Sequence, residues 1–378
     1  MKAPTDNKID YSGKLPSPPV FVVGYMHSGT TLLINILKSQ SSVFSGNRET
    51  KYFMHLPMIR KVYSDLENDE VLKNFVFYAI KIVKTGFNKT EMNVKVPAEF
   101  NVQWFGDDEK RLEVLMKDAK LNRDHGAIFN LVSNHMAQSM GKSRWVEKTP
   151  THIFHIDEML KSVPDALFVE IVRDPRDVLA SKKTRRLGVW ESEKYAGDRL
   201  KKHREKAFDP LWDSLSWKSA IHAGRKARDK YPEKIILIRY EDLAENPEQK
   251  VREICDFLKM EFEPEMLNIT TRNSAEDDAE DVGQTGIQTN SIGRWHKTLR
   301  SPEVGVCQWQ VGEDMSDLGY SLVSISRKDK VKMPFVLAGG LFEFVRASYR
   351  RLRLGGWLYF QNVLVNYWKR VRILLFPS

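Results

Sequence analysis

The stretch Val20-Phe-Val-Val-Gly-Tyr-Met-His-Ser-Gly-Thr-Thr31 decides the fold of this chain. Its first four residues form an uninterrupted apolar run after a proline-rich entry, which is typical of a short buried strand. A turn with Gly24 and Gly29 follows, and residues 30–37 then have the apolar spacing of a helix. A strand, a glycine turn and a helix in this order predict the opening of a nucleotide-binding α/β fold.

Three later apolar segments are also predicted to be strands, with helical patterns between and after them. They are Arg144–Glu147, Leu167–Val172 and Ile235–Ile238. Because strands that alternate with helices form parallel sheets covered on both faces, we expect an α/β fold with a parallel sheet flanked by helices. Residues 56–84 and 108–140 are expected to be helical insertions into this fold.

The net charge of +9 is confined to one end of the 378 residues. Residues 327–378 carry 11 Lys and Arg against two Asp and Glu, so the first 326 residues are neutral overall. A nucleic-acid-binding domain carries its basic residues as a patch on the folded domain, so this distribution argues against a nucleic-acid partner. We expect a polar segment at 1–17, a neutral catalytic domain at 18–326 and a basic appendage at 327–378.

The cysteine content and the N-terminus predict a cytoplasmic protein. Two cysteines, Cys255 and Cys307, are too few for a disulfide framework or a thiolate metal site. Residues 1–17 are polar and lack the apolar core of a secretory signal. We therefore expect a reducing compartment and no bound metal.

The glycine turn has the spacing of a phosphate-binding loop, whose backbone N–H groups and following helix N-terminus attract an anion. Thr30 stands where an ATPase carries the lysine that contacts the β- and γ-phosphates, so a triphosphate would lose its main cationic partner. The loop therefore favours a smaller anion, such as a 5′-phosphate that bears one further group. Taken alone, the glycine pair fits an ordinary strand-to-helix turn equally well.

A second constellation, residues 168–181, is a strand that ends at Arg173 and a helix that begins with Asp-Pro, where proline is favoured. Arg173 lies at the carboxyl end of its strand, where α/β sheets bind ligands, and Ser181 follows about two helical turns later. We predict that both side chains converge on one phosphate. The alternative is that Arg173 pairs with Asp174 or Asp177 and that Ser181 is a surface hydroxyl.

Together these two constellations resemble the PAPS-dependent sulfotransferases, in which the first motif binds the 5′-phosphosulfate of 3′-phosphoadenosine 5′-phosphosulfate (PAPS) and the second binds its 3′-phosphate. Leu-Leu rather than Trp after Gly-Thr-Thr resembles the bacterial-type and the carbohydrate- or tyrosine-modifying branches. Between Pro18 and Val323, six segments follow the family's order: Glu49–Phe53, Glu147–Pro150, Phe168–Ser181, Arg239–Leu243, Gly293–Trp295 and Leu318–Tyr320.

The resemblance implies a phosphate-loop (P-loop) nucleotide-binding fold of the sulfotransferase type. It also implies transfer of a sulfuryl group from PAPS, without a metal, to a hydroxyl or less often an amine of a carbohydrate, lipid or other small acceptor. The implied ligands of the nucleotide are His27, Ser28, Gly29, Thr30 and Thr31 for the phosphosulfate, Arg173 and Ser181 for the 3′-phosphate, and Arg294 as a second 3′-phosphate ligand.

His27 departs from the family pattern, in which Lys or Arg precedes Ser-Gly-Thr-Thr and neutralises charge on the bridging oxygen as the sulfuryl group leaves. Imidazole does this as a cation or as a neutral N–H donor, and its ordinary pKa of about 6.5 makes it a weaker cation at pH 7. A bound phosphosulfate is expected to raise that pKa by charge pairing. The alternative is that Lys51 or Lys148 supplies the cation.

An acceptor alcohol needs a base within hydrogen-bond reach, because it is a poor nucleophile at neutral pH. The resemblance assigns this role to Glu49, with His27 and Lys148 as the other catalytic residues. Lys148 is expected to contact the sulfuryl oxygens or the acceptor. Without the resemblance, Glu49 is a solvated charge between basic neighbours, and Glu147 and His152 are alternative bases.

Residues 334–378 mix large apolar side chains with Arg and Lys, and no apolar stretch reaches the roughly 18 residues of a spanning helix. Aromatic residues beside basic clusters suit a bilayer interface, so we expect this segment to lie on an anionic membrane, at its inner face. The alternative is a pair of helices that pack on the domain or on a second subunit.

Two other functions compete with sulfuryl transfer. A nucleoside or small-molecule kinase shares the phosphate loop, but Thr30 in place of the loop lysine argues against it. The second is a catalytically impaired nucleotide-binding membrane scaffold, which the replacement of the usual Lys or Arg by His27 suggests.

Overall fold

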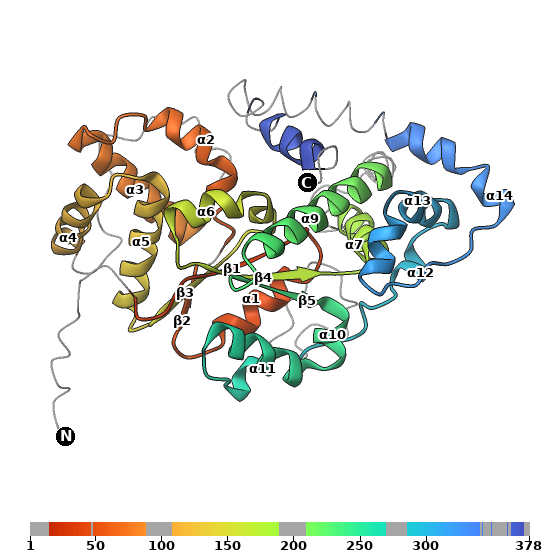
Figure 1. Ribbon diagram of the computed structural model, residues 1–378, viewed down its shortest axis with the longest axis horizontal. Coiled ribbons are helices and arrows are strands. Elements are labelled where there is room, and N and C mark those ends of the chain that lie inside the picture. The colour runs from red at the N-terminus through yellow and green to blue at the C-terminus, as the bar shows by residue number, and fades with distance from the viewer. Residues whose placement is uncertain are drawn as a thin grey trace. The chain divides into compact units, whose positions relative to one another are not determined.

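Figure 1 shows the computed structural model of the chain. It describes residues 15–46, 48–87, 108–188, 209–269, 286–340 and 364–373, with the single positions 342, 349 and 361. Most of the predicted polar segment and much of the predicted basic appendage lie outside these residues. Among the described helices, none combines the length and apolarity needed to cross a membrane.

A five-stranded parallel sheet, flanked by helices, has the strand order β2-β3-β1-β4-β5 (Figure 1). In the parallel pairs β2–β3 and β4–β5, Val43 lies opposite Arg144 and Phe168 lies opposite Ile235. The strands are β1 (Val20–Gly24), β2 (Val43–Ser45), β3 (Arg144–Lys148), β4 (Leu167–Val172) and β5 (Ile235–Arg239). The predicted α/β class is confirmed, and the four predicted strands lie within one residue of their expected bounds.

The chain divides into two compact units, which share strand β1. The first unit is Met1–Phe21, Leu37–Thr149 and His155–Leu167. The second unit is Val22–Ile36, Pro150–Phe154 and Phe168–Ser378. The predicted boundaries after residues 17 and 326 stay predictions.

The first unit is built on capped helices around an aromatic core. The side chains of Asn68 and Asp124 accept hydrogen bonds from the first backbone N–H groups of α3 and α5, so each predicted helical insertion is divided into two helices. Tyr52 stacks on Phe129 with ring centroids 4.2 Å apart in the buried core. The helices are α2 (Tyr52–Val62), α3 (Asp69–Thr85), α4 (Asp108–Leu121), α5 (His125–Ser139) and α6 (Ile156–Ser162).

The second unit contains the helices that follow β1, β4 and β5. Helices α7, α9 and α11 each begin with proline, which is pre-organised for a first helical position. Helix α9 packs against α7 and α13 (Figure 1). The helices are α1 (Thr30–Lys38), η2 (Pro150–His155), α7 (Pro175–Gly188), α9 (Pro210–Lys230), α10 (Tyr240–Glu245), α11 (Pro247–Leu258), η3 (Pro264–Met266), α12 (Trp295–Thr298), α13 (Ser301–Asp317) and α14 (Arg327–Lys330), and residues 333–340 and 364–373 are also helical.

Candidate active site

The phosphate loop, Gly24–Thr31, joins β1 to α1 through a backbone that needs its two glycines. Gly24 and Gly29 have φ angles of 143° and 94°. A Cβ atom at Gly24 would lie 2.4 Å from the carbonyl oxygen of Ile171, and one at Gly29 would lie 2.4 Å from the Tyr240 ring. The glycines therefore let the loop approach β4 and Tyr240 closely, which an ordinary turn does not require.

Two of the buried polar atoms in the second unit that have no hydrogen-bond partner among the described residues lie at the phosphate loop. They are the Ser28 hydroxyl in the loop, on a residue that is 0% exposed, and Nε of Arg173 at the end of β4, on a residue that is 6% exposed. Leaving a buried donor unsatisfied costs about 1–3 kcal/mol, so native proteins rarely do so without a ligand. An anion at the N-terminus of α1 would supply the missing acceptor, so these residues fit a phosphate-bearing ligand.

His27 contacts both Ser181 and Arg173, the two residues predicted to converge on one phosphate. The imidazole Nδ1 of His27 lies 3.1 Å from Oγ of Ser181 on α7. Arg173 donates to the backbone carbonyl of His27 at 3.3 Å, and its guanidinium lies 4.4 Å from the centroid of the Tyr240 ring. The loop, the end of β4 and α7 therefore present these three side chains at one place.

Arg173 forms no ion pair with Asp174 or Asp177 in the described structure, although its charge acts to lower the pKa of Asp177. Asp174 forms its ion pair with Arg176, with 2.6 Å between Nη2 and Oδ2. Asp177 accepts hydrogen bonds from backbone N–H groups. Arg173 instead donates to the carbonyl oxygens of His27 and Ser291.

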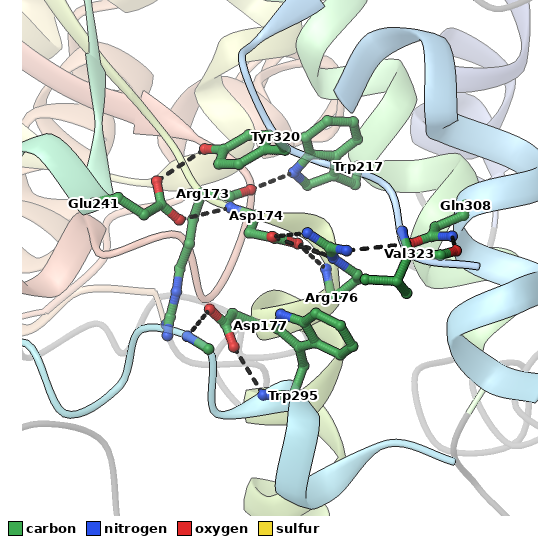
Figure 2. Close-up of polar contacts among 11 residues, drawn as sticks. Arg173, Asp174, Arg176, Asp177, Trp217, Glu241, Trp295, Gln308, Tyr320 and Val323 are labelled. Atoms are coloured by element: carbon green, nitrogen blue, oxygen red, sulfur yellow. Dashed lines mark hydrogen bonds and ion pairs between the residues drawn. The ribbon is translucent and has the colours of Figure 1, made fainter. Parts of the chain in front are cut away.

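Asp177 binds the segment that carries Arg294, and sequence reasoning missed this role. Its carboxylate accepts the N–H of Gly293 at 2.8 Å and the N–H of Trp295 at 2.9 Å (Figure 2). The guanidinium of Arg176 lies 4.3 Å from the centroid of the Trp295 ring. Burial raises the pKa of Asp177. These contacts attach residues 293–295 to α7. They therefore position the backbone of Arg294, the predicted second phosphate ligand.

A buried lysine fastens the loop to α7 and α9. Lys182 donates to the hydroxyl of Tyr25 and to Oδ1 of Asp213, both at 2.6 Å. Burial alone would lower the pKa of Lys182, but Asp213 and Tyr25 raise it above its ordinary value. The ammonium group therefore stays charged next to the loop, in an ion pair with Asp213.

Glu49 and Lys148 form an ion pair in the first unit. Nζ of Lys148 donates to Oε1 of Glu49 at 2.7 Å, and Nζ of Lys51 lies 3.7 Å from Oε2. The side chains of Glu49 and Lys148 are 31% and 16% exposed. The predicted base and its neighbouring cation therefore meet each other and remain accessible to solvent.

Glu147, an alternative base, holds the backbone beside Glu49 instead. Its Oε1 accepts hydrogen bonds from the N–H of Thr50 at 3.0 Å, the hydroxyl of Thr50 at 2.8 Å and the hydroxyl of Thr149 at 2.6 Å. These three hydrogen bonds commit Oε1 of Glu147 to Thr50 and Thr149. His152, the other alternative, is 0% exposed and lies in the second unit, so the structure favours neither.

At the first turn of α1, Thr30 is buried and Thr31 is exposed. Within the described ranges, no group of three or more His, Cys, Asp or Glu side chains is arranged to hold a metal ion. Cys255 and Cys307 are both buried and free.

Comparisons with known proteins converge on one family. The model of the sulfotransferase family matches residues 18–264. An uncharacterized protein of Aquifex aeolicus (strain VF5) is 23% identical over 292 residues, which cover 74% of this chain and 30% of that protein. Carbohydrate sulfotransferase 3 of Mus musculus is 29% identical over 168 residues, which cover 42% of this chain and 34% of that protein. The matched regions thus span about a third of these relatives' own length.

Among solved structures, the sulfotransferase domain from the Synechococcus PCC 7002 olefin synthase is similar to this chain. The match has 17% sequence identity and a TM-score of 0.48, and it covers 82% of this chain and 97% of that domain.

Proposed function

We propose, because the chain belongs to the sulfotransferase family, that it transfers the sulfuryl group of PAPS to a hydroxyl group of a carbohydrate, lipid or other small acceptor. Sulfuryl transfer in general follows from the family. The choice of PAPS as donor is our inference, and one observation carries it. The Ser28 hydroxyl and Arg173 Nε are buried without a described partner, and the phosphates of PAPS would accept a hydrogen bond from each.

The second unit supplies the groups that we assign to the nucleotide. The N-terminus of α1 and the Ser28 hydroxyl bind the 5′-phosphosulfate. Arg173 and Ser181 bind the 3′-phosphate, where a guanidinium forms a charge-assisted hydrogen bond. His27 donates from its ring to the oxygen that bridges phosphorus and sulfur, and it stabilises the charge that remains on the leaving phosphate.

The first unit supplies the group that we assign to the acceptor. Glu49 accepts the proton of the acceptor hydroxyl as its oxygen forms a bond to sulfur and the bond from sulfur to the 5′-phosphate breaks. Lys148 orients Glu49 through the 2.7 Å contact. If sulfuryl transfer resembles phosphoryl transfer in its loose transition state, alignment and stabilisation of the leaving phosphate are the main sources of rate acceleration.

A kinase activity is less compatible with the loop. Thr30 occupies the place of the lysine that would contact a triphosphate. The nearest buried lysine that the loop contacts, Lys182, is already bonded to Asp213 and Tyr25.

The test is nucleotide binding followed by turnover. The purified full chain is titrated with 3′,5′-adenosine bisphosphate (PAP) and with ATP and Mg²⁺ in a calorimeter. It is then incubated with PAPS and a panel of hydroxyl-bearing carbohydrates and lipids while released PAP is measured. We expect PAP to bind more tightly than ATP and to be released from PAPS when an acceptor is present. Tighter ATP binding, or ADP release with the same acceptors, would overturn the proposal.

A further inference from the structure

The C-terminal helix (residues 364–373) packs on the second unit through one face. Tyr367 meets Trp212 of α9 edge-on, with ring centroids 5.0 Å apart. Arg370 lies over the ring of Phe154, with Cζ 5.2 Å from its centroid. These contacts confirm, for this helix, the alternative in which the basic appendage packs on the domain.

The other face of the C-terminal helix is exposed and apolar. Leu364, Val365 and Trp368 are 47%, 44% and 60% exposed, and Arg372 is exposed beside them. At 3.6 residues per turn, these four side chains lie within roughly a third of the helix circumference, on the side opposite Arg370. We call these four residues the outer face.

The outer face lies in the part of the chain where exposed apolar side chains and positive charge coincide. The net charge of residues 327–378 is +9, because they hold only two acidic residues. Large exposed apolar side chains recur through the described residues of this segment: Val331, Phe335, Phe342, Tyr349, Leu364, Val365 and Trp368. Aromatic and aliphatic side chains combined with Lys and Arg are the composition of helices that lie in a bilayer interface.

We propose that the outer face docks on an anionic lipid surface, with the C-terminal helix lying parallel to it. Trp368, Leu364 and Val365 insert among the headgroups, and Arg372 contacts lipid phosphates or carboxylates. We choose lipid as the occupant because exposed tryptophan and aliphatic side chains beside basic residues are the composition of bilayer-interface helices, and the positive charge of the segment attracts anionic headgroups. This inference stands apart from the proposed function, since none of these residues contacts the phosphate loop or Glu49 in the described structure.

The face of the C-terminal helix that carries Tyr367 and Arg370 joins the helix to the rest of the second unit. Tyr367 and Arg370 join the C-terminal helix to Trp212 and Phe154, which belong to the same unit as the phosphate loop. Docking of the outer face would therefore hold the second unit at a lipid surface in one orientation, rather than tether it through a loose tail.

The test is co-sedimentation of the full chain with phosphatidylcholine vesicles, with and without phosphatidylserine, over a range of salt concentrations. We expect binding only with phosphatidylserine, and only partial release by salt, because the apolar contacts are insensitive to screening. Trp368→Gln should weaken binding about tenfold. Arg372→Gln should lower the preference for phosphatidylserine.

Trp309→Gln is the matched control, because Trp309 is a 68% exposed tryptophan on α13, outside the basic segment. It should bind vesicles like the wild type, and all variants should keep the wild-type melting temperature and PAP affinity. Equal binding of Trp368→Gln and wild type, or equal binding to both kinds of vesicle, would overturn the proposal. A dimer in analytical ultracentrifugation that Trp368→Gln dissociates would also overturn it, and would assign the outer face to a second copy of the chain.

Discussion

The phosphate loop of the second unit and the Glu49–Lys148 pair of the first unit are prepared for their ligands in opposite ways. Around the loop, the Ser28 hydroxyl and Arg173 Nε are buried and lack a partner among the described residues. In the first unit, Glu49 and Lys148 are partly exposed and bind each other at 2.7 Å. The loop region has unsatisfied donors that an anion would accept from, whereas the first unit has the predicted base already bonded to a cation.

This difference assigns different consequences to mutations in the two regions. A buried donor without a partner destabilises the empty protein and gains its hydrogen bond only from the ligand, so its removal should weaken binding. An exposed ion pair contributes little to stability, so its removal should leave binding and folding intact and should affect only the chemical step.

The largest expected effect is on turnover in Glu49→Gln. The amide keeps the shape and still accepts a hydrogen bond from Lys148, but it does not take a proton, so kcat should fall by about 10²-fold or more. PAP affinity should stay at the wild-type value in calorimetry. Lys51→Gln is the control, because Lys51 contacts the same carboxylate at the longer distance of 3.7 Å and should change kcat less. Wild-type turnover in Glu49→Gln would show that Glu49 is not the general base.

The second effect is on PAP binding in Arg173→Ala. Loss of a charge-assisted hydrogen bond should raise the dissociation constant about 10- to 100-fold. The dissociation constant of Arg173→Lys should lie between those of the wild type and Arg173→Ala, because lysine keeps the positive charge but not the paired N–H donors of the guanidinium. Ser181→Ala should raise the constant only a few-fold. Unchanged PAP affinity in both alanine variants would show that the 3′-phosphate binds elsewhere.

The smallest effect is on the pH profile in His27→Lys. If the imidazole acts as a cation, wild-type kcat should fall on the alkaline side of neutrality, where histidine is a weaker cation than lysine. Lysine stays charged there, so the variant should keep its activity and lose the alkaline decline. His27→Ala should be slow at every pH. An alkaline decline that persists in His27→Lys would exclude the imidazole as its source.

The strands could be predicted because their signal is local. The residues of β1 form an apolar run, and the structure buries all five of them. Strand β2 has only three residues, Val43–Ser45, which is too short to show any periodicity, and the sequence analysis missed it. The breaks at Asn68 and Asp124 carried a recognisable capping signal that the analysis did not use.

The site could be predicted only where chain order determines it. Arg173 lies at the carboxyl end of a parallel strand, so its proximity to the phosphate loop follows from topology. The bond of Asp177 to Trp295 spans 118 residues and that of Lys182 to Tyr25 spans 157, and no local pattern reports contacts at such separations. Asp177 matches the common preference for an acidic residue in the first turn of a helix, and this preference alone accounts for its place in the sequence. Its bonds to the Arg294 segment were therefore not predicted.

The left-handed backbone of His27, with φ of 68°, has a consequence for how this position can change over evolutionary time. Histidine and asparagine are several-fold enriched in that conformation, whereas the branched Val, Ile and Thr are strongly disfavoured. Lysine is tolerated in this chain, since Lys51 and Lys259 also have positive φ. An acidic residue would repel the bound anion. Natural selection therefore has a narrow set of replacements at position 27, and related lineages should exchange histidine mainly for lysine, arginine or asparagine.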